Sequence, residues 1–111
     1  MAEILAQGDL LFERVFDVIA PVGLPAGEPV VLAEGETTGH RHMVWDRVAF
    51  FRDDGLARDI PDGLYVGHLQ VADGLARVQH EEHAPIDLGQ GVWRVRRQRE
   101  LEPKDVRIVR D

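Results

Sequence analysis

The sequence predicts a small single-domain fold that is mainly β, either a barrel or a sandwich, with at most one short helix. Three observations predict it. A chain of 111 residues is long enough for one core, which we place over residues 1–111. Its 11 glycines and 6 prolines divide it into short segments. Three Asp-Gly pairs, Asp54-Gly55, Asp62-Gly63 and Asp73-Gly74, are typical of tight hairpin turns.

The elements follow in order. Leu10–Val18 fits a strand or one short helix, because its apolar residues also recur at helical spacing. Residues 21–29 hold three prolines and two glycines, which predict an extended loop. Within Leu64–His80, YVGHLQV and LARVQH flank Ala72-Asp73-Gly74 and predict a hairpin. The other expected strands are Val30–Glu34, His42–Trp45, Val48–Arg52, Val92–Arg99 and Val106–Val109.

Composition excludes several classes of site. The chain has no cysteine, so it has no disulfide, thiolate metal site or cysteine nucleophile, and without serine it has no serine nucleophile. Its glycines match neither a P-loop nor a dinucleotide fingerprint. No apolar stretch approaches the roughly 20 residues that span a bilayer, and the acidic amino terminus lacks the pattern of a signal peptide. We expect a cytoplasmic protein that binds no membrane.

Four of the five histidines fall in two dense groups, His40-Arg41-His42 and His80-Glu81-Glu82-His83. Residues two apart in a strand project from the same face, so His40 and His42 can direct two nitrogens at one point. His80 and His83 can join them if His80 ends a strand and His83 lies in the turn that follows. The four then form a pocket for a divalent transition metal, such as Zn, Fe, Ni or Mn, that acts on a small molecule.

Carboxylates near these histidines can act as metal ligands or as a general base. Glu81, Glu82 or Asp46 can add an oxygen ligand to a metal, and Glu82 or Glu81 can serve as general base. The lone His68 alternates with Val66 and Gln70, and we expect it to be an ordinary strand histidine.

The same histidines fit a second chemistry that needs no metal. Neutral imidazole is a general base and its cation a general acid, and two of them across a phosphodiester cleave RNA or a cyclic oligonucleotide through the 2′-hydroxyl, as a ring nuclease does. In this interpretation the catalytic residues are His40, His42, His80, His83 and Glu82. A third interpretation is a noncatalytic binding module whose histidines are structural or act as a pH switch.

Charge favours a small molecule or a compact anion over extended nucleic acid as the partner. The net charge of −7 disfavours extended nucleic acid, yet residues 94–111 hold 7 basic and 4 acidic residues. Arg97 and Arg99 share a strand face with Trp93 and Val95, so they line a pocket or neutralise acidic residues beside it. Arg94, Arg96 and Thr38 are further candidate contacts to an anionic ligand. An exposed strand edge would also permit a homodimer.

Gly35, His40, His42 and Asp46 resemble the first cupin motif, and His80 falls where a later cupin histidine lies, although the Pro-x-Gly and asparagine of the second motif are missing. The resemblance covers the central half of the chain. It implies a small β-barrel whose metal is held by His40, His42, His80 and Asp46, with His83 as an additional ligand or a base beside it. The longer string AEGETTGHRH, QHEEHAPIDL and GVWRVRRQRE resembles small uncharacterised bacterial and phage proteins.

Overall fold

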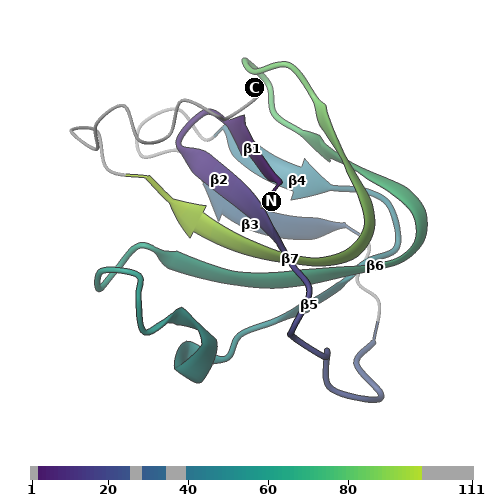
Figure 1. Cartoon of the computed structure of the whole chain (residues 1–111). Helices are drawn as coiled ribbons and strands as arrows, with labels where there is room; N and C mark the ends of the chain where they lie inside the picture. The colour runs from purple at the N-terminus through teal and green to yellow at the C-terminus, as the bar shows by residue number, and fades with distance from the viewer. Residues whose placement is uncertain (1–2, 26–28, 35–39, 99–111) are drawn as a thin grey trace.

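One antiparallel sheet of seven strands makes up most of the part of the chain that the computed structural model describes, residues 3–25, 29–34 and 40–98 (Figure 1). The strands are β1 (Ile4–Gln7), β2 (Leu10–Val15), β3 (Val30–Glu34), β4 (Arg41–Val44), β5 (Ala49–Phe51), β6 (Tyr65–Gln79) and β7 (Ile86–Arg97). Their order is β1-β2-β7-β6-β4-β3, with β5 also paired to β6. The prediction of a mainly β fold is confirmed. The sheet resembles a small sandwich and is not a closed barrel, because β1 and β3 remain edge strands.

The long strands β6 and β7 pair along most of their length and curve together around one side of the molecule (Figure 1). The hairpin expected within Leu64–His80 is therefore wrong, because both halves of that segment belong to β6 and pair with β7. The register shifts between Val71 and Leu75, where Gly74 has a φ of 69°. A glycine with positive φ suits a β-bulge as well as a turn, and here it bends the strand instead of reversing it.

The amino-terminal segment is a strand and not a helix. Leu10, Leu11 and Phe12 at the start of β2 are buried, and β2 lies between β1 and β7. The sequence did not predict β1. Asp54-Gly55, expected in a hairpin turn, instead begins a short 3-10 helix, η1 (Asp54–Ala57). Within the described residues no helix is long and apolar enough to cross a membrane.

The core consists of a main cluster of buried apolar side chains and a smaller second cluster. Its largest fully buried side chains are Trp93, Phe12, Leu10, Leu69 and Leu88. Burying each such side chain contributes roughly 1.5–3 kcal/mol. The indole N–H of Trp93 donates to the carbonyl of Gly89 at 2.9 Å, so the largest core residue leaves no polar atom unpaired.

Candidate functional site

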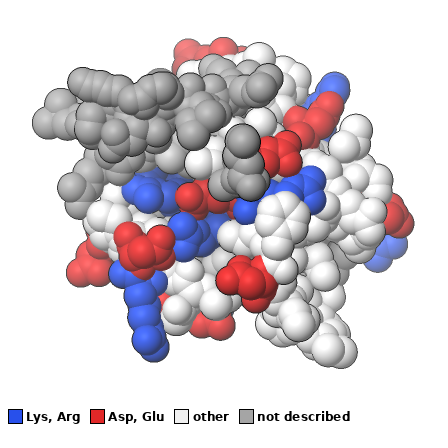
Figure 2. Space-filling view, viewed as in Figure 1, with Lys and Arg blue, Asp and Glu red and all other residues white. Residues whose placement is uncertain are grey.

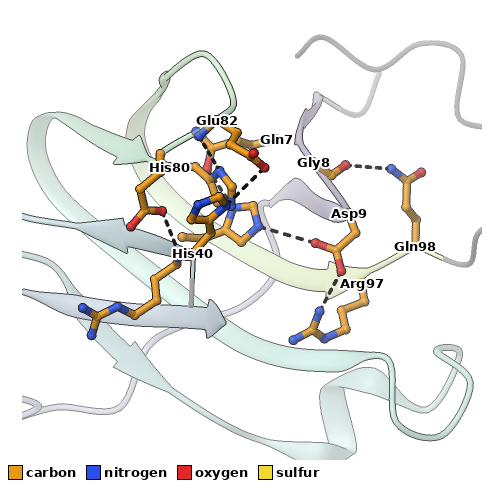
Figure 3. Close-up of polar contacts among 11 residues, drawn as sticks. Gln7, Gly8, Asp9, His40, His80, Glu82, Arg97 and Gln98 are labelled. Atoms are coloured by element: carbon orange, nitrogen blue, oxygen red, sulfur yellow. Dashed lines mark hydrogen bonds and ion pairs between the residues drawn. The ribbon is translucent and has the colours of Figure 1, made fainter. Parts of the chain in front are cut away.

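Four histidines that are distant in sequence lie together, and we call His40, His42, His80 and His83 the histidine cluster. Ring centroids are 4.4 Å apart for His42 and His80, 4.7 Å for His80 and His83, and 5.6 Å for His40 and His80. Figure 3 shows His40 and His80 near Gln7, at the turn between β1 and β2. The two dense sequence groups thus meet at one place.

Strand pairing explains how the two groups meet. Met43 of β4 pairs with Gln79 of β6, so His80, which follows β6, lies beside β4. His42 alternates with the more exposed Arg41 and Met43 and points into the protein, where it is 3% exposed. His40 lies one residue before β4, so the expected shared strand face applies to His42 alone.

Gln7, the last residue of β1, fixes the proton on the ring of His42. Its side-chain amide is fully buried, and Nε2 donates to the carbonyls of Val78 at 2.9 Å and Ala84 at 3.0 Å. The amide oxygen therefore faces His42 Nδ1, at 2.8 Å. Since an amide oxygen only accepts, Nδ1 must carry the hydrogen, and Nε2 of neutral His42 carries a lone pair.

His80 is held in the opposite tautomer. The backbone N–H of Glu82 donates to His80 Nδ1 at 3.0 Å. Nδ1 therefore carries the lone pair, and neutral His80 has its hydrogen on Nε2. Adjacent rings thus present an acceptor, His42 Nε2, and a donor, His80 Nε2–H.

The turn between β1 and β2 brings a carboxylate to the acceptor atom. Asp9 Oδ1 lies 3.4 Å from His42 Nε2, while Asp9 Oδ2 accepts from Arg97 Nη1 at 2.6 Å (Figure 3). Arg97 follows Trp93 and Val95 on the strand face that the alternation predicts, and it neutralises an acidic residue beside the histidine cluster. Gln98 donates to the carbonyl of Gly8 at 3.2 Å, which ties the end of β7 to the same turn.

Burial keeps His42 neutral. Burial away from water, and the charge of a protonated His80, lower the pKa of His42 from 6.5 to about 4, against the opposing effect of Asp9. At neutral pH the ring is therefore unprotonated at Nε2. Asp9 favours the imidazolium form once a proton arrives there.

Gly8 makes room for the ring of His83. Its φ is 59°, and a Cβ at this position would lie 2.8 Å from both Cδ2 and Nε2 of that ring. The ring of His83 stands nearly parallel to that of His42, with an interplanar angle of 6° and a centroid distance of 6.4 Å. A side chain at residue 8 would displace His83 from the cluster.

The remaining acidic candidates separate into different roles. Glu82 Oε1 lies 3.1 Å from His40 Nδ1. Glu81 accepts from the backbone N–H of Arg41 at 2.9 Å and so fixes the loop after β6, which also lowers the pKa of Glu81. Asp46 accepts from the backbone N–H of Arg77 at 2.8 Å, so its carboxylate holds a turn.

The predicted metal set is not assembled in the described ranges. Within residues 3–25, 29–34 and 40–98, no three His, Asp or Glu side chains are arranged as ligands of one metal ion. Arg94 is a structural residue, because its guanidinium contacts Glu13 and Asp59, each at 2.8 Å. Thr38, Arg99 and the segment Val106–Val109, as well as Gly35, lie outside the described residues.

His68 is more deeply buried than a common strand histidine. It is fully buried, stacks against Phe51 at 5.2 Å and has Nδ1 2.6 Å from the hydroxyl of Tyr65. Its Nε2 has no hydrogen-bond partner in the described part of the chain. It packs in the core, apart from the histidine cluster.

Sequence could not have identified Gln7 and Asp9 as members of the site. Gln7 and Val78 are 71 residues apart, and a glutamine before a glycine turn carries no chemical signature.

The sequence model of one protein family matches residues 6–98. The chain belongs to DUF8820, a domain family of unknown function.

The range matched to DUF8820 includes the whole histidine cluster, Asp9 and Arg97. Membership agrees with the expected likeness to small uncharacterised proteins and says nothing about the cupin resemblance. Searches of curated proteins and of solved structures find no match to the chain.

Proposed function

We propose that the histidine cluster is an acid–base site that acts on a phosphodiester in RNA or a cyclic oligonucleotide without a resident metal ion. The observation that carries this proposal is the pair of opposite tautomers. His42 presents a lone pair at Nε2, and the adjacent His80 presents an N–H at Nε2. A metal ion held between these two nitrogens would need lone pairs on both, whereas proton transfer to and from a bound anion needs one of each.

Each residue then has a role in transesterification. His42 Nε2 takes the proton of the 2′-hydroxyl as that oxygen attacks phosphorus, and Asp9 stabilises the imidazolium that forms. His80 Nε2–H donates a hydrogen bond to a non-bridging phosphate oxygen. His40, oriented by Glu82 through Nδ1, gives a proton to the leaving 5′-oxygen as its bond to phosphorus breaks. The products are a 2′,3′-cyclic phosphate and a 5′-hydroxyl.

Charge supports a compact substrate. The ion pair between Arg97 and Asp9 places a guanidinium beside the histidine cluster. On the face drawn in Figure 2, outside the grey atoms, basic and acidic side chains are interspersed and form no continuous basic surface. Extended nucleic acid binds along continuous positive surfaces. A short or cyclic oligonucleotide fits a small site better.

Cleavage of labelled linear and cyclic oligoribonucleotides in EDTA tests the proposal. We expect the native chain to cleave at least one of them and His42→Gln to lose about 100-fold or more of the rate, the usual contribution of one general base. Arg77→Met, which changes an exposed ion pair with Asp87 away from the cluster, is the matched control and should keep full activity. Failure of the native chain to cleave any of these substrates would refute the proposal.

A bound transition metal is the second candidate, supported by one distance. Two ligands about 2.05 Å from a tetrahedral ion lie about 3.4 Å apart, and His42 Nε2 and Asp9 Oδ1 are 3.4 Å apart. Gln7 also accepts a hydrogen bond from the other ring nitrogen of His42, which would orient the ring toward a metal ion. Metal analysis of protein purified without a histidine tag separates the candidates. Stoichiometric metal that is lost in both His42→Ala and His83→Ala would favour this one.

A further inference from the structure

We propose that the groove beside His80 holds a planar base of the substrate, stacked on Trp45. The proposal rests on the phosphodiester function above and names the group next to the reacting phosphate. The groove has a volume of about 210 Å³. Its lining residues are Arg41, Met43, Trp45, Gln79, His80 and Glu81.

The alternation of β4 builds this groove. His42 and Val44 point into the protein, while Arg41, Met43 and the following Trp45 lie toward solvent. Trp45 is 56% exposed, whereas the other tryptophan, Trp93, is fully buried. A large exposed aromatic ring in a groove is a common platform for stacking bases.

His80 joins the groove to the histidine cluster. It lines the groove, and its ring lies 4.4 Å from that of His42 and 5.6 Å from that of His40. A base held on Trp45 would thus place its sugar and phosphate next to the ring of His80. The backbone N–H of Arg41 donates to the carboxylate of Glu81 at 2.9 Å, which keeps the two walls of the groove together.

Size and chemistry favour a nucleobase as the occupant. The volume is below the roughly 300–1,000 Å³ of pockets for drug-sized ligands, so the groove fits one ring system. Trp45 and Met43 offer apolar surface. Arg41 and Gln79 supply hydrogen-bond donors, and Gln79 and Glu81 supply acceptors. A flat ring with polar edges matches this combination.

Tryptophan fluorescence of the intact chain tests the proposal, because only one of the two indoles is exposed. The probes are the four nucleoside 3′-monophosphates, with inorganic phosphate as the control that has no base. We expect saturable quenching by at least one nucleotide and none by phosphate. Trp45→Leu should abolish the quenching and weaken nucleotide binding in calorimetry about 10-fold or more. Leu75→Ala, which changes an exposed apolar side chain on β6, should leave both unchanged.

The outcomes separate the two proposals. Quenching that is lost in Trp45→Leu, without cleavage of any oligonucleotide, would support the subsite and refute the phosphodiester function. Cleavage with the same KM in the native chain and Trp45→Leu would support that function and overturn the subsite. Equal calorimetric affinity of both chains for every nucleotide would also overturn it, and Trp45→Phe, which keeps a stacking ring, should retain most of the binding.

Discussion

Replacing Gln7 by methionine removes the hydrogen bonds that fix His42 while keeping the length of the side chain. The amide of Gln7 pairs with three groups. Ala84 is exposed, so water can replace the bond to its carbonyl, but Val78 and His42 are buried and lose a partner without compensation. An unpaired buried polar group costs about 1–3 kcal/mol. We therefore expect Gln7→Met to lower the free energy of unfolding by about 2–6 kcal/mol.

Urea unfolding followed by circular dichroism measures this change. Gln98→Met is the matched control, because it removes one half-buried hydrogen bond to the same turn and should cost about 1 kcal/mol or less. A loss in Gln7→Met no larger than that of Gln98→Met would contradict this prediction. It would mean that the Gln7 amide is not the buried link between β1, β4 and the β6–β7 hairpin.

Three further predictions concern pH, an ion pair and a glycine. Because the pKa of His42 is lowered from 6.5 to about 4, the unfolded chain binds more protons than the folded chain in this range. Stability should therefore be complete above pH 6.5 and fall toward pH 4, by at most about 3 kcal/mol from this residue. Urea midpoints across that range should show a smaller slope for His42→Gln, with a remainder from His68, whose pKa burial also lowers. Arg94→Met should lower the free energy of unfolding by about 2 kcal/mol in thermal or urea unfolding, because it leaves the half-buried Glu13 without its cation. The control Arg77→Met, at an exposed ion pair, should leave the urea midpoint unchanged. Equal effects of the two substitutions would contradict a structural role of Arg94. Gly8→Ala and Gly74→Ala both place alanine at a positive φ, with a strain of about 1–2 kcal/mol, but only Gly8→Ala meets a neighbour, the ring of His83. It should be the more destabilising of the two and should alone shift the His83 ring signals in NMR spectra, whereas unchanged signals would show that the ring does not rest on Gly8.

Local sequence patterns were sufficient to predict the strands whose own residues identify them, whatever strands they pair with. Val30–Glu34 matches β3, and the alternation in β7 placed Arg97 on the face of Trp93 and Val95. The Asp73-Gly74 pair misled, because positive φ serves both a turn and a bulge and only the pairing with β7 decides between them. The sequence of Leu10–Val18 fits both a helix and a strand. Pairing with β1 and β7 decides that it forms the strand β2.

The site was predictable only in part. The density of histidines marked His40, His42, His80 and His83, and the pairing of β4 with β6 brings the two groups together. Their tautomers depend on contacts that no local pattern encodes. Gln7 reaches His42 across 35 residues, and the backbone of Glu82 reaches the ring of His80 only in the particular turn that the chain adopts there.

Long-range proton–nitrogen NMR of the imidazole rings at pH 7 tests the two opposite tautomers, because it reports which nitrogen of each neutral ring carries the hydrogen. We expect hydrogen on Nδ1 of His42 and on Nε2 of His80, and we expect Gln7→Met to release the first of these preferences. Hydrogen on Nε2 of His42, or on Nδ1 of His80, would rule out this pair of tautomers. The adjacent acceptor and donor on which the proposed acid–base site depends would then be absent.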